Sequence, residues 1–136
     1  SIAMDTKEED IALERLIAKR SDPDDCIFGV YGWHLGGMYL YANRKPCSPY
    51  FILNIATDQQ KDEIVTDLLN QPPAAIQYVR GYEDAIEVPE FESKYFNFPI
   101  VLEKCYDIAS PSASLFFPKP DLDLKACVAE HFSNNE

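Results

Sequence analysis

The sequence lacks the long apolar segments that would mark a membrane protein or a secretory leader. No apolar run approaches the roughly 20 residues that a helix needs to cross a bilayer. The start of the chain, Ser1 to Met4, has no basic region followed by an apolar core. These four residues could equally be left by cloning ahead of a native Asp5. We therefore expect one soluble domain spanning residues 1–136, a size typical of a single domain.

Basic residues are also scarce. Lys and Arg number 12 against 23 acidic residues, which gives a formal net charge of −11. Such a field repels phosphate backbones, and no local cluster of Lys and Arg reverses it, so nucleic acid is excluded as a partner. Anionic lipid headgroups are disfavoured for the same reason, although a membrane tether could override this effect.

Motifs for metal, nucleophile and cofactor chemistry are missing. His34 has no Cys or carboxylate at ligand spacing, which argues against a metal site there, and no G-x-S-x-G sequence supplies a nucleophile. Glycines from Gly29 to Gly37 follow the pattern G-x-x-G-x-x-x-G-G rather than the dinucleotide fingerprint G-x-G-x-x-G. We assign no catalytic residue, no metal and no cofactor.

Short apolar segments alternate with amphipathic ones along the rest of the chain. The apolar periodicity predicts helices over residues 7–20, 38–42, 61–70 and 100–104, with Thr57 or Asp58 capping the third. Strands are predicted over residues 26–31, 50–55 and 74–79, followed by a hairpin of 106–109 and 114–117. Residues 80–99 are predicted as a loop with a short helix, and 121–136 as a weak helix or tail.

This order of elements predicts an α/β fold. Helices between successive strands imply a mostly parallel sheet, and the hairpin adds an antiparallel C-terminal edge. Right-handed crossovers would place the first strand in the centre, with the second and third on either side. We therefore expect a three-layer, Rossmann-like domain of half the usual size.

Ligands of such sheets bind beyond the carboxyl ends of the strands. The loops expected there carry an aromatic ring, an imidazole and a guanidinium, which could bind a sugar or a phosphate; the candidate residues are Trp33, His34, Arg80 and Tyr82. The alternative is that the glycines only let the chain turn and that the tryptophan packs on the sheet.

Arg44 and Lys45 form a basic pair in a loop of this acidic chain. They could contact an anion such as a lipid phosphate. The alternative is a solvated loop that balances local charge.

The four cysteines are too widely spaced for a C-x-x-C motif, but their even number allows disulfides in an oxidising compartment. Cys26 and Cys47 lie near the starts of strands predicted to be neighbours, about 5 Å apart, which is within disulfide range. Cys105 could then pair with Cys127. Other connectivities, or four free thiols packed as small apolar groups, stay open.

Residues 24–34 (DDCIFGVYGWH), 39–50 (YLYANRKPCSPY) and 67–79 (DLLNQPPAAIQYV) resemble a known family. They are similar to the C-terminal soluble region of bacterial polytopic glycosyltransferases of the GT-C type, relatives of the dolichyl-phosphate-mannose protein mannosyltransferases and the aminoarabinose transferases. The resemblance covers roughly residues 8–117. Cys47, where a smaller residue is usual, and the acidic balance depart from the family.

The resemblance implies a parent enzyme that moves a sugar from a polyprenyl-phosphate carrier to an acceptor at the outer membrane face. The family's catalytic acid lies between early transmembrane helices, and no position of this chain matches it. We therefore expect an accessory domain, inactive alone, on the extracytoplasmic (periplasmic) face of the inner membrane. Its expected partners are the transmembrane region of the parent chain and a carrier-lipid phosphate or glycan acceptor.

Two alternatives come from other classes of protein. The first is a free-standing module that binds a sugar or a protein through the Trp33 crevice. The second is a small cytosolic enzyme that uses His34 and Arg80.

Overall fold

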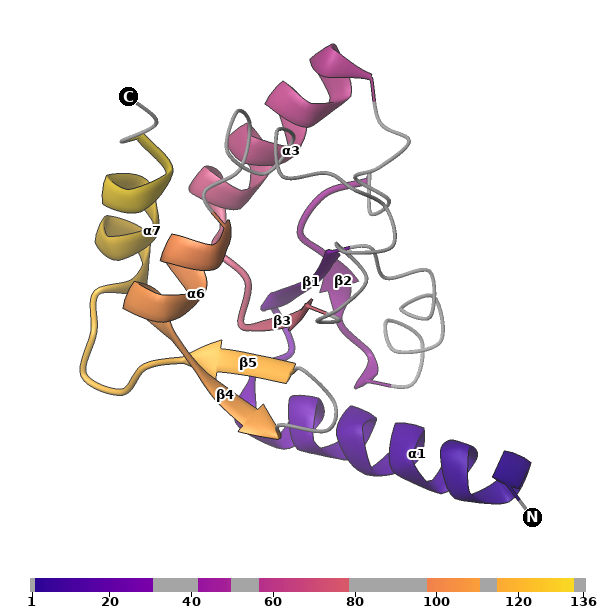
Figure 1. The fold of residues 1–136 in the computed structure, drawn as a ribbon. Helices are drawn as coiled ribbons and strands as arrows, with labels where there is room; N and C mark the ends of the chain where they lie inside the picture. The colour runs from indigo at the N-terminus through magenta and orange to yellow at the C-terminus, as the bar shows by residue number, and fades with distance from the viewer. Residues whose placement is uncertain (1, 31–41, 50–56, 79–97, 111–114, 134–136) are drawn as a thin grey trace.

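The computed structural model describes residues 2–30, 42–49, 57–78, 98–110 and 115–133. Within these ranges the chain forms a mixed α/β fold with one five-stranded sheet and four helices (Figure 1). The α/β class predicted from the sequence is therefore confirmed. None of the four helices combines the length and the apolar character that crossing a bilayer requires.

The sheet joins a parallel part to an antiparallel hairpin. Its strands are β1 (Cys26–Val30), β2 (Lys45–Pro46), β3 (Ala75–Tyr78), β4 (Tyr106–Ser110) and β5 (Leu115–Pro118). They lie in the order β2-β1-β3-β5-β4. Strand β1 is parallel to both β2 and β3, while β5 is antiparallel to β3 and β4. The parallel neighbours of β1 on both sides and the C-terminal hairpin are as predicted, but only the neighbour β3 is one of the strands predicted for those places.

The second strand differs from the sequence prediction. Strand β2 consists of only two residues, both exposed, which pair with Cys26 and Ile27 of β1. The sequence analysis placed Lys45 in a loop, because an exposed Lys-Pro dipeptide carries no apolar pattern that would predict a strand. The strand predicted over residues 50–55 lies outside the described residues, as do most of 38–42 and 80–99.

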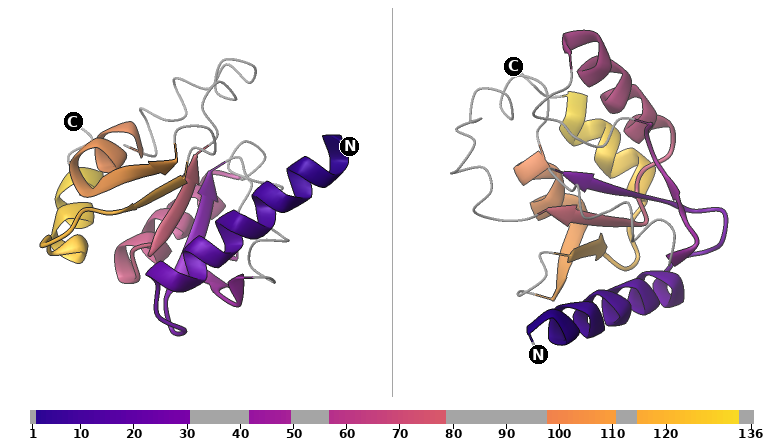
Figure 2. Two further views of the ribbon diagram at one scale, coloured as in Figure 1. Left: turned by 90° about the horizontal axis from the view of Figure 1, so that it is seen from below. Right: turned by 90° about the vertical axis from the view of Figure 1, so that its right-hand side faces the viewer.

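The four described helices match four of the predicted helical segments, with ends that differ by a few residues. They are α1 (Ile2–Arg20), α3 (Asp58–Asn70), α6 (Phe98–Cys105) and α7 (Leu124–Ser133). Helix α1 lies on one side of the sheet, and α3 and α7 lie on the other (Figures 1 and 2). The C-terminal segment, predicted as a weak helix or tail, is packed: Cys127, Val128 and Phe132 of α7 are buried.

Helix α3 begins at a capping box. The Thr57 side chain accepts a hydrogen bond from the Gln60 backbone N–H at 3.2 Å, and the Gln60 side chain accepts one from the Thr57 N–H at 2.9 Å. Two N–H groups that the first helical turn leaves without partners are satisfied in this way. The cap that the sequence placed at Thr57 or Asp58 is therefore Thr57.

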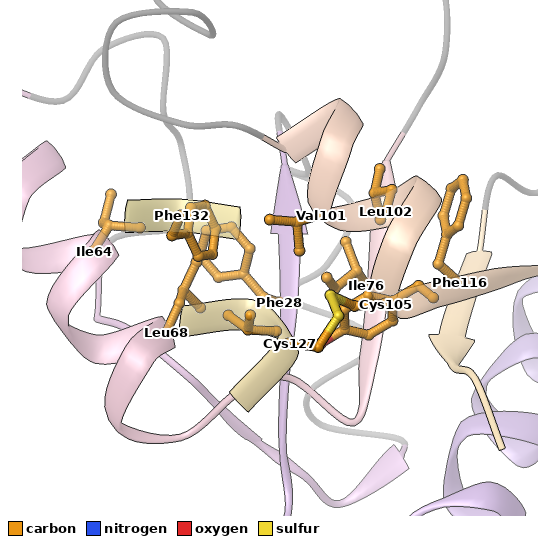
Figure 3. Close-up of a cluster of buried hydrophobic side chains, with 12 residues drawn as sticks. Phe28, Ile64, Leu68, Ile76, Val101, Leu102, Cys105, Phe116, Cys127 and Phe132 are labelled. Atoms are coloured by element: carbon orange, nitrogen blue, oxygen red, sulfur yellow. A yellow bond between two sulfur atoms is a disulfide. The ribbon is translucent and has the colours of Figure 1, made fainter. Parts of the chain in front are cut away.

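Apolar cores form on both sides of the sheet, because successive strand residues point to opposite faces. Ile27 of β1 belongs to the core beneath α1, together with Ile17, Ala42, Ala75, Leu115 and Phe117. Phe28 belongs to the larger core under the other helices (Figure 3), together with Ile64, Leu68, Ile76, Val101, Leu102, Cys105, Tyr106, Phe116, Cys127, Val128 and Phe132.

Tyr106 is the largest fully buried polar side chain in the larger core. Its hydroxyl donates a 2.7 Å hydrogen bond to the Pro73 carbonyl, which ties the start of β4 to the segment that enters β3. Burial raises the pKa of Tyr106 well above its usual value, because the phenolate form would lose its hydration. The phenol is therefore neutral and structural.

Candidate functional site

The carboxyl ends of β1 and β3 lie side by side, because the two strands are parallel and Val30 pairs with Tyr78. This is the edge at which the sequence predicted a ligand crevice. The side chains expected to line it lie outside the described residues: Trp33, His34, Arg80 and Tyr82. The structure thus confirms that the two strand ends are adjacent. Whether the four side chains come together there stays a prediction.

Gln77 of β3 lies next to this edge and has an unsatisfied polar atom. Its side-chain oxygen Oε1 is buried and has no hydrogen-bond partner in the described structure. The residue opposite it on β1 is Gly29, which has no side chain to supply a donor. A buried carbonyl oxygen without a donor costs about 1–3 kcal/mol. Gln77 is therefore a candidate acceptor for a ligand, and the sequence analysis did not single it out.

Arg44 does not lie in a solvated loop. Its guanidinium is buried, and each of its five N–H groups donates to a protein oxygen. Nε donates to Ser21 Oγ at 2.9 Å, Nη1 to the carbonyls of Ala42 and Asn43 at 3.1 Å, and Nη2 to the carbonyls of Ala18 and Ser21 at 3.0 Å. The side chain thereby joins the end of α1 to the turn that leads into β2.

This geometry explains why an arginine stands at position 44. The last carbonyls of a helix lack intrahelical partners, and the negative end of the helix dipole favours a cation there. Because all five donors are used, Arg44 has no N–H left for a lipid phosphate. The suggested anion contact of Arg44 does not fit the structure, while Lys45 is an exposed cation on β2.

The cysteines form two disulfides, in the pairing that the sequence analysis put forward. Cys26 of β1 is bonded to Cys47, just after β2, with their Cα atoms 4.8 Å apart. Cys105, at the end of α6, is bonded to Cys127 of α7, with Cα atoms 5.9 Å apart (Figure 3). Each bond therefore joins two cysteines that lie more than twenty residues apart in the sequence.

Ser48 is also part of the framework. It is buried, and its Oγ donates a 2.9 Å hydrogen bond to Asp67 Oδ2 of α3. A carboxylate that accepts from a buried hydroxyl anchors that hydroxyl. The pair holds the segment after β2 against α3.

One side-chain cluster was missed by the sequence analysis. His131 of α7 lies beside the Cys105–Cys127 disulfide, and its nearest ring nitrogen and the two sulfur atoms all lie within 4.8 Å of one another. The available signal was the spacing of Cys127 and His131, four residues apart on a predicted helix.

No protein-family model matches this chain, and comparisons with curated proteins and with solved structures found nothing similar.

Proposed function

We propose that this chain is an accessory, non-catalytic domain of a membrane-bound glycosyltransferase that uses a polyprenyl-phosphate-sugar donor. The observation that carries the proposal is the closure of all four cysteines into two disulfides. Disulfides form and persist in oxidising compartments and are rare in the cytosol. They favour an extracytoplasmic place, which is also where the resembled family has its soluble C-terminal region.

The described polar groups support a structural role over a catalytic one. Arg44 caps a helix, Ser48 is bonded to Asp67, and the Tyr106 hydroxyl is bonded to a carbonyl. A catalytic acid, base or nucleophile has to reach a substrate, whereas these groups are buried and hydrogen-bonded within the fold. The domain would then serve to hold and shape a site whose catalytic acid lies elsewhere in the parent chain.

The fold is part of the same proposal. The parallel order β2-β1-β3 and the apolar cores on both faces support a three-layer, Rossmann-like domain of half the usual size. In such a domain the carboxyl edge of β1 and β3 would face the carrier lipid or the acceptor.

The test combines topology with activity. The complete coding sequence around this chain should encode several apolar spans of about 20 residues before it. In spheroplasts, externally added protease should degrade the chain, and a maleimide reagent should label its cysteines only after reduction. The isolated chain should transfer no sugar from a polyprenyl-phosphate donor. A coding sequence without such spans, cytoplasmic protection, four reactive thiols or measurable transfer by the isolated chain would each contradict the proposal.

A second candidate is favoured by Gln77 alone: a module that binds a polar ligand, such as a sugar, at the carboxyl edge. A ligand hydroxyl that donates to Gln77 Oε1 would satisfy the buried atom. Glycan titration followed by Trp33 fluorescence tests this function. Gln77→Leu should abolish the response without loss of stability, whereas Gln59→Leu, on the exposed side of α3, should bind as wild type. A normal response from Gln77→Leu, or none from the wild type, would remove this candidate.

A further inference from the structure

Three side chains with metal-binding atoms meet where α6 and α7 come together. Cys127 and His131 are four residues apart on α7, so they lie on one face of the helix, one turn apart. Cys105 comes from the last position of α6. The two sulfur atoms and a ring nitrogen of His131 lie within 4.8 Å of one another. In the structure, the two sulfur atoms share a disulfide.

The same three atoms form a ligand set that suits zinc. Zn²⁺ binds thiolate sulfur at about 2.3 Å and imidazole nitrogen at about 2.0–2.1 Å in tetrahedral sites. Neighbouring ligand atoms of such a site are therefore roughly 3.5–3.8 Å apart. With the Cα atoms 5.9 Å apart, rotation of each cysteine about its Cα–Cβ bond can separate the sulfurs to this distance. The backbone of α6 and α7 can stay in place.

The surroundings of the cluster match those of a zinc site that is open on one side. Cys105 is fully buried and Cys127 is nearly so, while His131 is half-buried. Apolar neighbours such as Val101 and Val128 would strengthen the metal–ligand attraction, because they exclude water. His131 is the most exposed of the three residues, so a fourth ligand from solvent would reach the ion from its side. Around the Cys26–Cys47 disulfide, no third ligand of this kind was found among the described residues.

We propose that the Cys105–Cys127 disulfide is a redox-controlled zinc site. A dithiol reductant gives two electrons and two protons to the disulfide, becomes a disulfide itself and leaves two thiols. Each thiol releases its proton as Zn²⁺ binds, and His131 and a water molecule complete the coordination. The ion then takes over from the disulfide as the link between α6 and α7. This inference is independent of the proposed glycosyltransferase role.

The experiment uses the full chain with Cys26→Ser and Cys47→Ser, so that only the second disulfide is present. A phosphine reduces it without chelating metal, and the phosphine takes up an oxygen atom from water. Cobalt(II) is then titrated as a spectroscopic probe, and zinc is used to displace it. The reduced protein should bind one equivalent, with a thiolate-to-cobalt charge-transfer band and the visible bands of a tetrahedral ion. The oxidised protein should bind none.

Two variants separate a built site from thiols that bind cobalt nonspecifically. His131→Ala should weaken cobalt affinity at least about tenfold, because mutation of even the residues that support metal ligands typically costs about 10–100-fold in affinity. Glu130→Gln, exposed and adjacent on α7, should bind as the parent does. Far-ultraviolet circular dichroism follows folding, and zinc should restore any helix lost on reduction. An absent charge-transfer band, an unchanged affinity in His131→Ala, or a reduced chain that zinc fails to refold would each overturn the proposal.

Discussion

Removing the hydrogen bonds of Arg44 tests whether this residue stabilises the end of α1 or instead binds a ligand. Arg44→Met keeps most of the apolar stem and deletes all five N–H donors. The carbonyls of Ala18 and Ala42 lose their charged partner, as do three other oxygens. Hydrogen bonds to charged groups contribute about 1.5–3 kcal/mol each, but they are not additive here. Relief of guanidinium desolvation offsets part of the loss, so we expect a net destabilisation of about 2–4 kcal/mol.

The assay is equilibrium unfolding of the oxidised protein in urea, followed by circular dichroism. A domain of this length has an unfolding entropy near 0.3 kcal/mol per kelvin, so the same loss lowers Tm by roughly 7–14 °C. Arg44→Lys should lie between the wild type and Arg44→Met, because an ammonium group offers three donors without the planar fork. The m-value should not change if both states keep their compactness.

Lys45→Met is the matched control, since it removes the neighbouring positive charge from an exposed side chain of β2. Its effect should stay within about 0.5 kcal/mol. If Arg44→Met is no more destabilising than Lys45→Met, the hydrogen bonds of Arg44 do not stabilise the fold, which contradicts its role at the end of α1. If lipid phosphate binding is lost only in Arg44→Met while stability is kept, Arg44 is a ligand after all.

Three other features of the framework give measurable effects. Tyr106→Phe should cost about 1–2 kcal/mol in urea unfolding, because the Pro73 carbonyl loses its donor. The raised pKa of Tyr106 stabilises the fold at pH values below the unfolded-state pKa of about 10. This contribution is lost as pH rises further, by up to about 1.4 kcal/mol per pH unit. The stability difference between wild type and Tyr106→Phe should therefore shrink from pH 9 to pH 11, and a constant difference would refute this. Replacing Cys26 and Cys47 together by Ala should cost about 3 kcal/mol, from the entropy of a loop closed over 21 residues, and an unfolding midpoint equal to wild type would show that the bond does not form. Thr57→Ala should cost about 1 kcal/mol through loss of the α3 cap, whereas Thr66→Ala, within the same helix, serves as the control and should cost clearly less.

The elements with strong local signals could be predicted from the sequence. Strand β3 follows Pro72-Pro73 and precedes a polar stretch of sequence, and strands β4 and β5 are short segments on either side of a Pro-Ser-Ala sequence. Helix α3 carries its own cap at Thr57. In each of these cases the residues that determine the element are neighbours in the sequence, so the local sequence pattern is enough to predict it.

The features that could not be predicted depend on tertiary neighbours. Strand β2 exists only because β1 offers backbone partners to an exposed Lys-Pro dipeptide. The partners of Arg44 are mainly main-chain carbonyls, some of them more than twenty residues away, and a carbonyl leaves no trace in a sequence pattern. A basic residue in a loop therefore gives the same signal whether it caps a helix or contacts an anion.

The position of the Cys105–Cys127 disulfide gives it a large effect on the stability of the domain. It closes a loop of 22 residues, worth about 3 kcal/mol, against a total stability of about 5–15 kcal/mol for a typical domain. Both sulfurs lie in the core that also contains Phe28 and Val128. Opening the bond would therefore weaken the attachment of α7 to the core, not merely free a surface loop. A zinc ion held by the same sulfurs and His131 would restore the link. The redox state of this one pair would then decide how firmly α7 is attached to the sheet.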